Sequence, residues 1–163
     1  MSEHPASEEN LGFLLWQVST LWSSSTAAAL KQFGLTHPHF VILATIDWLT
    51  GKGASQEQIG RHTVLDPKPT AHLLRSLQVK GLVEPSDTTD EKNRFPLLTN
   101  AGKEMLAKVL PVIESADAAF FASLEQTNSK MVTALQILAR ANFPKHGGES
   151  CCLSEDDGES CGG

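Results

Sequence analysis

The body of this 163-residue chain contains no cysteine, because all three, Cys151, Cys152 and Cys161, lie in the segment "GGESCCLSEDDGESCGG" at residues 147–163. A disulfide framework within the body is therefore excluded, which suits a reducing compartment. The chain also has no apolar run that approaches the roughly 20 residues of a membrane span. Its first ten residues, "MSEHPASEEN", lack the basic start and the apolar stretch of a secretory signal. These absences predict a protein of the cytoplasm.

Motifs of common enzyme chemistry are also missing. The sequence has no nucleophile elbow, no phosphate-binding loop, no metal-binding motif and no carboxylate pair. His37 and His39, in "THPHF", could suggest metal ligands, but no cluster with suitable spacing completes a site around them. Helix-cap or surface roles are more common for such histidines. We therefore expect neither an enzyme nor a cofactor.

Acidic residues are concentrated at the two ends of the chain, whose formal net charge is -6. Residues 1–10 hold three acids and residues 147–163 hold five, which leaves 11 acids in the body against all 13 lysines and arginines. The body between the ends is therefore slightly basic, at about +2. Because the distribution of charge matters more than its sum for DNA binding, the acidic total does not exclude a nucleic-acid partner.

Apolar residues at three- and four-residue steps predict that most of the body is helical. Cap residues and glycines mark where these helices begin and end. The predicted helices cover residues 8–33, from Thr36 to about Thr50, 56–62, 67–80, from Thr99 to at least Phe120, and 129–142. The third and fourth helices, joined by a short turn, resemble a helix-turn-helix.

Two short strands are predicted between the fourth and fifth helices. The segments "LVEP" and "FPLL" have strand character, and the polar segment "SDTTDEKNR" between them is typical of a hairpin loop. Pro85 and Pro96 restrict these strands to short or edge pairing.

This order of elements resembles the MarR family of winged helix-turn-helix regulators. The resemblance covers about residues 10–142 and is carried by "LT" at Leu35–Thr36, "SQEQIGRH", "LLRSLQVKGLV" and "LTNAGKEML". It implies a mainly α fold with a small two-stranded β-wing and helical arms that form a two-fold homodimer. The divisions expected on this basis are a disordered acidic N-terminus at 1–10, a helical dimerisation region at 11–34 and 100–143, a winged helix-turn-helix DNA-binding domain at 35–99, and a disordered acidic, cysteine-containing tail at 144–163.

The resemblance also implies how the chain would read double-stranded DNA with a pseudo-palindromic operator. The recognition-type helix would enter the major groove, where hydroxyl and basic side chains meet bases and phosphates. The wing would reach the minor groove, whose narrow form attracts cations. The residues predicted to contact DNA are Gln56, Lys68, Thr70, His72, Arg75, Lys92 and Arg94. The family's wing usually resembles Asp-x-Arg, whereas this chain has Asp90-Glu91-Lys92, and lysine lacks the planar fork of arginine.

Two groups of residues are candidates for sensing a signal. Trp16, Trp22, Phe40 and Trp48 could line a pocket for an aromatic effector, although core or interface packing is the more frequent role of such side chains. The three tail cysteines could bind a soft metal or metalloid, or become oxidised. An incidental, unstructured tail is the alternative.

The sequence as a whole therefore predicts a homodimeric, sequence-specific DNA-binding transcriptional regulator. We expect a repressor that is released by a small aromatic molecule, an oxidant or a thiophilic metal. The alternative is a non-DNA interaction module, or a soft-metal-binding protein, on a winged-helix scaffold.

Overall fold

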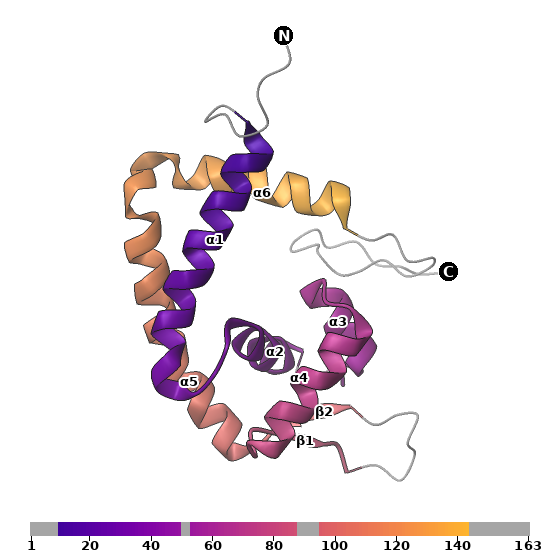
Figure 1. Ribbon diagram of the computed structural model, residues 1–163. Helices are drawn as coiled ribbons and strands as arrows, with labels where there is room; N and C mark the ends of the chain where they lie inside the picture. Colours follow the sequence, from indigo (N-terminus) through magenta and orange to yellow (C-terminus); the bar gives the residue numbers. More distant parts are fainter. Residues whose placement is uncertain (1–9, 50–52, 88–94, 144–163) are drawn as a thin grey trace, which may run out of the picture. The chain divides into compact units, whose positions relative to one another are not determined.

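The computed structural model describes residues 10–49, 53–87 and 95–143, whose helices and strands are labelled in Figure 1. The chain is mainly α-helical with one two-stranded antiparallel sheet. The predicted fold class and the predicted order of elements are therefore confirmed. In chain order the elements are α1 (Leu11–Leu30), η1 (Lys31–Phe33), α2 (His37–Trp48), α3 (Gln56–Thr63), α4 (Pro67–Val79), β1 (Val83–Pro85), β2 (Pro96–Leu98), α5 (Asn100–Phe121), η3 (Ala122–Thr127) and α6 (Asn128–Asn142).

The chain divides into two compact units, residues 1–128 and residues 129–163. The first unit contains α1 to η3, and the second contains α6 from its second residue onward. Among the described residues, no helix combines the length and the apolar character that crossing a membrane requires.

The helices begin and end where local hydrogen bonding favours it. The side-chain oxygen of Ser55 accepts a hydrogen bond from the backbone N–H of Gln58 at 3.2 Å, and Oε1 of Gln58 accepts one from the backbone N–H of Ser55 at 2.7 Å. This reciprocal pair is a capping box, which satisfies backbone N–H groups that the first turn of α3 leaves free. Gly34 and Gly81 follow η1 and α4 in the left-handed region, at φ values of 63° and 70°. Glycine enters this region without the clash of a Cβ atom, so both predicted helix ends are explained.

One apolar core holds the first unit together. Every helix from α1 to α5 and both strands contribute to it, and α1 also packs along α5 (Figure 1). The strands pair in the register Val83 with Leu98 and Pro85 with Pro96, so each proline lies at an end of the short ladder. The buried apolar residues are Leu30, Leu35, Ile42, Leu43, Ile46, Ala54, Ile59, Leu74, Leu77, Leu82, Val83, Leu98, Leu106, Val109 and Ile113.

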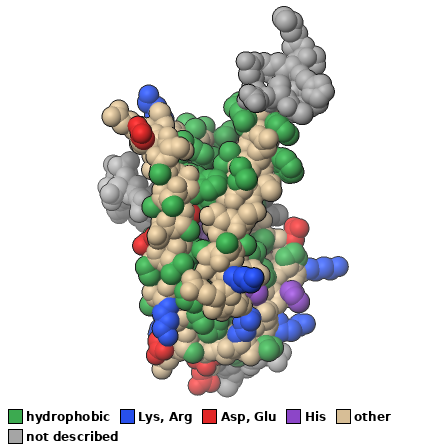
Figure 2. Space-filling view, turned by 60° about the vertical axis from the view of Figure 1, so that its left-hand side comes forward, with side chains coloured by type: hydrophobic (Ala, Val, Ile, Leu, Met, Phe, Trp, Pro, Cys, Tyr) green, Lys and Arg blue, Asp and Glu red, His purple; other side chains and the backbone are tan. Residues whose placement is uncertain are grey.

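Large apolar side chains also remain at the surface of α1 and α6. Leu11 and Trp16 on α1 are 84% and 64% exposed, and Ile137 on α6 is 63% exposed. Figure 2 shows hydrophobic side chains at the surface on one face of the chain. Other exposed apolar residues of the two helices are Leu15, Leu21, Val132, Leu135 and Leu138. Exposed apolar side chains of this size are candidates for contacts with another protein.

The turn between α3 and α4 contains a backbone strain that can be relieved. Val64 ends α3 in the left-handed region at a φ of 55°, where a β-branched side chain is disfavoured, and it is 61% exposed. We expect Val64→Gly to stabilise the fold by about 1 kcal/mol in urea unfolding, since glycine removes this strain. Val79→Gly is the matched control, because Val79 is also exposed but lies in a helix, where glycine is unfavourable. A lower stability of the Val64→Gly variant would contradict the proposal that the backbone at Val64 is strained.

Candidate nucleic-acid interface

Helices α3 and α4 pack closely at the point where the chain turns between them. A Cβ atom at Gly60 would lie 3.1 Å from Oγ1 of Thr70 and 3.2 Å from the carbonyl oxygen of Leu65, so a side chain there would crowd both atoms. The backbone N–H of Leu65 also donates to the carbonyl of Gly60 at 2.9 Å, which closes the end of α3. The two helices and their short turn form a helix-turn-helix unit that faces the core through Ile59 and Leu77.

Thr70 belongs to this packing, and the prediction that it contacts DNA is wrong. Its side chain is fully buried, and its hydroxyl donates to the carbonyl of Asp66 at 2.9 Å, one turn back in the helix. A side chain enclosed between two helices cannot reach a base edge. Thr70 was expected to be exposed because it lies only two residues from Lys68 and from His72, and both of these side chains are exposed.

Lys68, His72 and Arg75 form one exposed face of α4, which we call the reader face. Their spacing of four and three residues places them on one side of a helix. This side is opposite to Leu74 and Leu77, which are buried in the core. Among the described residues, the only ion pair joins Glu57 to Arg61, so the cations of the reader face have no carboxylate partner there. The reader face can therefore offer its donors to phosphates or base edges.

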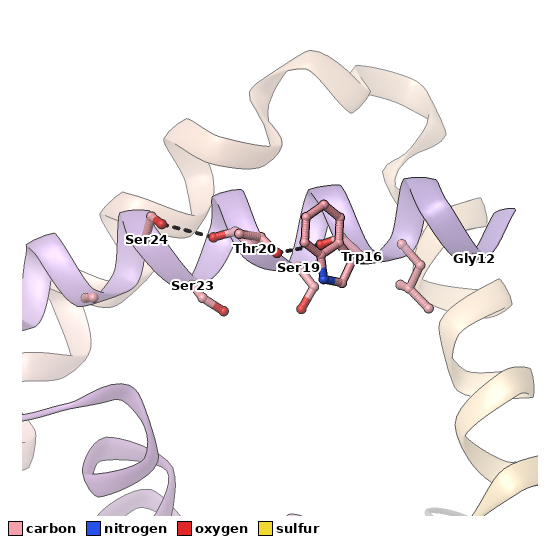
Figure 3. Close-up of a pocket in the computed structure, with 8 residues that line it drawn as sticks. Gly12, Trp16, Ser19, Thr20, Ser23 and Ser24 are labelled. Atoms are coloured by element: carbon pink, nitrogen blue, oxygen red, sulfur yellow. Dashed lines mark hydrogen bonds between the residues drawn. The ribbon is translucent and has the colours of Figure 1, made fainter. Parts of the chain in front are cut away.

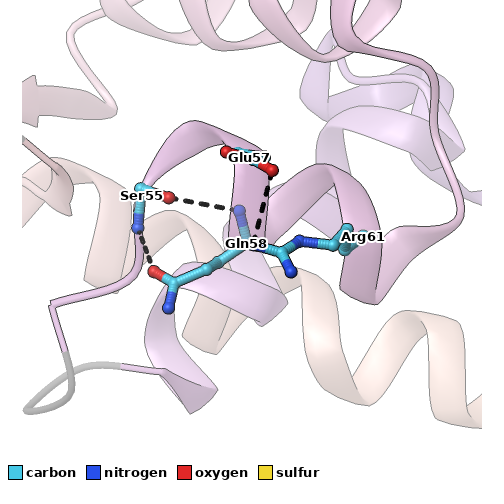
Figure 4. A network of polar contacts seen from close by, with 4 residues as sticks. All are labelled: Ser55, Glu57, Gln58 and Arg61. Carbon is cyan, nitrogen blue, oxygen red and sulfur yellow. Dashed lines mark hydrogen bonds and ion pairs between the residues drawn. The ribbon is translucent and has the colours of Figure 1, made fainter. Parts of the chain in front are cut away.

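Gln56 is exposed at the first position of α3, next to the capping box and the ion pair that Figure 4 shows. The ion pair joins Nη2 of Arg61 to Oε1 of Glu57 at 3.5 Å, one turn apart on an exposed helix surface. Such a pair contributes only a few tenths of a kcal/mol. Since the side chain of Gln58 is engaged in the cap, Gln56 is the glutamine of this turn that can contact another molecule.

The predicted wing contacts, Lys92 and Arg94, lie outside the described residues. The structure does describe how the two sides of the hairpin are joined next to them. The backbone N–H of Ser86 donates to the carbonyl of Phe95 at 2.8 Å, and the N–H of Phe95 donates to Oγ of Ser86 at 3.1 Å. The buried hydroxyl of Ser86 therefore extends the pairing of β1 and β2 by one residue.

The four aromatic residues predicted to share one pocket are divided among different surroundings. Nε1 of Trp22 donates to Oδ1 of Asp117 on α5 at 2.8 Å, and the Trp22 ring meets the ring of His37 edge-on at 4.7 Å. Phe40 lies 6.1 Å from the same His37 ring, so Trp22 and Phe40 belong to one cluster. Trp48, 71% exposed at the end of α2, and Trp16, 64% exposed on α1, lie outside this cluster, so the structure brings together only two of the four residues.

Trp16 instead lines an open hollow of about 690 Å³ along α1 (Figure 3). All its lining residues come from this one helix, so the hollow is an uncovered helix face rather than an enclosed cavity. Two of the three serines that follow Trp22 take part, and Oγ of Ser24 donates to the carbonyl of Thr20 at 3.1 Å. The lining residues are Gly12, Leu15, Trp16, Ser19, Thr20, Ser23, Ser24 and Ala27.

The two histidines at the start of α2, His37 and His39, make contacts within the described part of the chain, with Trp22 and Ser76 respectively. Burial lowers the pKa of His37, against the opposing effect of the Asp117 carboxylate. Burial also lowers the pKa of His39, and the positive charges of Lys80 and His72 act in the same direction. No group of three or more histidine, cysteine, aspartate or glutamate residues in the described ranges could hold a metal ion. The cysteines of the predicted thiol site, Cys151, Cys152 and Cys161, lie outside these ranges.

Lowered histidine pKa values predict that the fold weakens in mild acid. Below the ordinary histidine pKa of about 6.5, the unfolded chain binds more protons than the folded one, so stability falls as the pH drops. We expect the free energy of unfolding in urea to decrease from pH 7.5 to pH 5.5. The double variant His37→Asn, His39→Asn should show a flatter profile over the same range. A wild-type stability that is constant or rises toward pH 5.5 would contradict the prediction.

Sequence reasoning missed one polar contact next to the reader face. Nε2 of His39 lies 3.1 Å from Oγ of Ser76 on α4, and this contact joins the first turn of α2 to the recognition-type helix. Its signal in the sequence was a histidine three residues after the Thr36 cap, the position where a capping box places a polar side chain. The partner on α4 could not be read from the sequence, because the two residues are 37 positions apart.

Known proteins with similar sequences and structures agree with this geometry. The uncharacterized HTH-type transcriptional regulator YdcH of Bacillus subtilis is 33% identical over 115 residues, which cover 69% of this chain and 78% of that protein. The HTH-type transcriptional repressor Rv2887 of Mycobacterium tuberculosis is 30% identical over 120 residues, which cover 73% of this chain and 85% of the repressor. No family model matches the chain.

Solved structures extend the similarity to the fold. A MarR family regulator from Rhodococcus sp. RHA1 has a TM-score of 0.74 at 23% identity, over 85% of this chain and 98% of that one. The Rv2887 protein, named as a MarR family protein in its complex with DNA, has a TM-score of 0.60 at 27% identity, over 81% of this chain and 97% of that one. These relatives are transcriptional regulators and not enzymes. The chain therefore belongs to the MarR family of winged helix-turn-helix transcriptional regulators.

Proposed function

We propose that this chain is a homodimeric, sequence-specific DNA-binding regulator of the cytoplasm that represses transcription until an effector releases it. The observation that carries the proposal is the reader face of α4, where Lys68, His72 and Arg75 are exposed on one side of a helix with no carboxylate partner among the described residues. A helix of this kind fits the major groove, and its cations suit phosphates and guanine edges.

Further DNA contacts are proposed around the reader face. Gln56, exposed at the start of α3, would meet a phosphate of the DNA backbone. Lys92 and Arg94 would extend the interface to the minor groove from the wing, next to the Ser86–Phe95 pairing. Support comes from Rv2887, which is named a repressor and has been solved in complex with DNA.

The homodimer is proposed from the apolar faces that the chain leaves uncovered. On α1, Leu11 is 84% exposed and Leu21 is 63% exposed, and α6 carries four further exposed apolar side chains. Burying such surface against a second copy stabilises both chains at roughly 25 cal/mol per Å². The proposed division of the chain places these helices in the dimerisation regions 11–34 and 100–143, outside the DNA-binding domain 35–99.

We expect sedimentation to show a stable dimer at micromolar concentration. The double variant Leu11→Lys, Leu21→Lys should shift the chain toward monomer, because each charge would have to be buried in the interface. Lys108→Glu is the control, since this exposed position of α5 carries a charge already. A folded wild-type monomer at micromolar concentration would refute the dimer.

An effector site is proposed at the junction of α1, α2 and α5. Trp22, His37 and Phe40 form an aromatic cluster there, and Asp117 supplies a polar group from α5. Rv2887 has been solved with salicylic acid and with p-aminosalicylic acid, which supports a small aromatic molecule as the class of effector. A thiophilic metal or an oxidant acting on Cys151, Cys152 and Cys161 is the second proposed signal. Either signal would act by changing the spacing of the two reader faces in the dimer.

Selection of genomic DNA fragments with the purified full chain tests the proposal most directly. We expect enrichment of fragments that share an inverted repeat, with half-sites about one helical turn apart. Binding to a selected duplex should weaken steeply with salt, since phosphate contacts release counterions. The alternative, a non-DNA interaction module or a soft-metal-binding protein on this scaffold, predicts no enrichment and no salt-dependent binding.

A further inference from the structure

His39 occupies an unusual place, because its two ring nitrogens serve two different helices. Nδ1 accepts a hydrogen bond from the backbone N–H of Thr36 at 3.2 Å, and it also lies 2.9 Å from Oγ1 of Thr36. These contacts complete the capping box of α2. On its other side, Nε2 lies 3.1 Å from Oγ of Ser76 in α4. A single ring therefore connects the first turn of α2 with the recognition-type helix.

The donors and acceptors of this contact set the protonation of the ring. A backbone N–H can only donate, so Nδ1 of His39 must be unprotonated where it accepts from Thr36. The neutral ring then carries its proton on Nε2, which donates to Oγ of Ser76. Protonation of the ring would place a hydrogen on Nδ1 and abolish the bond from the Thr36 N–H. The connection is complete only in the neutral form.

The charged groups that act on His39 favour this neutral form. His72 on α4 and Lys80, which follows the last residue of α4, lower the pKa of His39 by their positive charge, in addition to the larger effect of burial. His72 belongs to the reader face, and Ser76 is the next residue after Arg75. The ring therefore contacts α4 beside the side chains that would read DNA.

We propose that His39 is a positioning residue for DNA reading, whose neutral ring holds α4 through Ser76 and so fixes the direction of the reader face. This inference rests on the proposed DNA-binding function. His39 would affect DNA reading without touching DNA, and sequence discrimination would be lost in mild acid. A shift of the reader face weakens base contacts more than phosphate contacts, because hydrogen bonds to base edges need closer geometry.

The geometry can be tested first without DNA, by NMR of the histidine rings in the ¹⁵N-labelled full chain. At pH 7.5 we expect His39 to show the tautomer with the proton on Nε2. Lowering the pH should convert this ring to the charged form and shift the amide signals of Thr36 and Ser76 in the same step. A ring that carries its proton on Nδ1, or is already charged at pH 7.5, would overturn the inference.

DNA reading is then tested with the duplex that the wild-type chain selects from a random library at pH 7.5, against a scrambled duplex of equal length. The measured quantity is the ratio of the two affinities. Ser76→Ala removes the acceptor on α4 and leaves the cap intact, and His39→Asn keeps an acceptor near Thr36 but lacks the arm toward Ser76. We expect both variants to reduce the ratio by about five- to tenfold at pH 7.5, the loss that one hydrogen bond causes.

His39→Gln is the conservative variant, because its amide has an acceptor and a donor but does not titrate between pH 5 and 8. The wild-type ratio should fall about tenfold from pH 7.5 to pH 5.5, whereas the ratio of His39→Gln should stay nearly constant. The wild type and His39→Gln both contain His72, so a difference between their pH profiles is caused by the titration of His39.

Three results would overturn the inference. The first is an unchanged ratio in Ser76→Ala and His39→Asn, with both variants folded by urea unfolding. The second is a parallel pH profile for wild type and His39→Gln. The third is a wild-type chain without salt-dependent DNA binding, which refutes the proposed function itself. That third failure is recognised separately, because the NMR measurement of the His39 ring does not involve DNA.

Discussion

Replacing Arg75 with alanine is expected to cost about 1–3 kcal/mol of binding free energy for the selected duplex, the typical value of a lost guanine contact. Arg75 is exposed on the reader face, and no carboxylate among the described residues neutralises it. Its planar guanidinium can donate two parallel hydrogen bonds to one guanine. The affinity for a scrambled duplex should change much less, so the substitution should reduce discrimination.

Lys68→Ala tests a phosphate contact on the same reader face. We expect it to weaken binding to both duplexes and to flatten the dependence on salt by about one unit, because a lysine near the start of the helix suits a phosphate. Lys108→Ala is the matched control, since it removes the same charge from an exposed position of α5. Titrations of the three variants at several salt concentrations measure these effects. If Arg75→Ala and Lys68→Ala both behave like the control, α4 does not read DNA.

Gly102→Ala should destabilise the fold by about 2–4 kcal/mol, because the added methyl group has no space. A Cβ atom at this position would lie 2.0 Å from the carbonyl oxygen of Leu82 and 3.0 Å from its carbonyl carbon. The same carbonyl accepts the backbone N–H of Thr99 at 3.1 Å, and Oγ1 of Thr99 donates to the carbonyl of Gly81 at 2.7 Å. Relief of the clash would therefore separate α5 from the end of α4 and break hydrogen bonds at the cap.

Urea unfolding at one fixed protein concentration measures this loss, since the stability of a dimer depends on concentration. Gly12→Ala is the control for the change of residue type. A Cβ atom at Gly12 would approach only the flexible side chain of Asn10, at 3.4 Å, and alanine is the better helix former by up to about 1 kcal/mol. Equal stabilities of wild type and Gly102→Ala would show that Leu82 can move away without cost.

The sequence by itself determined the elements of the fold and their order. Ser55, Thr36 and Thr99 begin helices as predicted, and Gly34 and Gly81 end them, because capping depends on residues within one turn of each other. The wing strands are also local, since a turn-rich polar segment between two short apolar runs favours a hairpin. The exposed positions of Lys68, His72 and Arg75 followed from helical spacing alone.

Only the tertiary structure decided which side chains those elements bury and which they bring together. Thr70 has a polar side chain that suits a DNA contact, yet its proximity to Gly60 encloses it between two helices. Trp22 and Trp16 lie on one helix, but only Trp22 meets α5 and α2. His39 and Ser76 are distant in the chain and become partners because α2 packs on α4. Helical periodicity fixes the direction of a side chain around its own axis, whereas the packing of neighbouring helices fixes what that side chain touches.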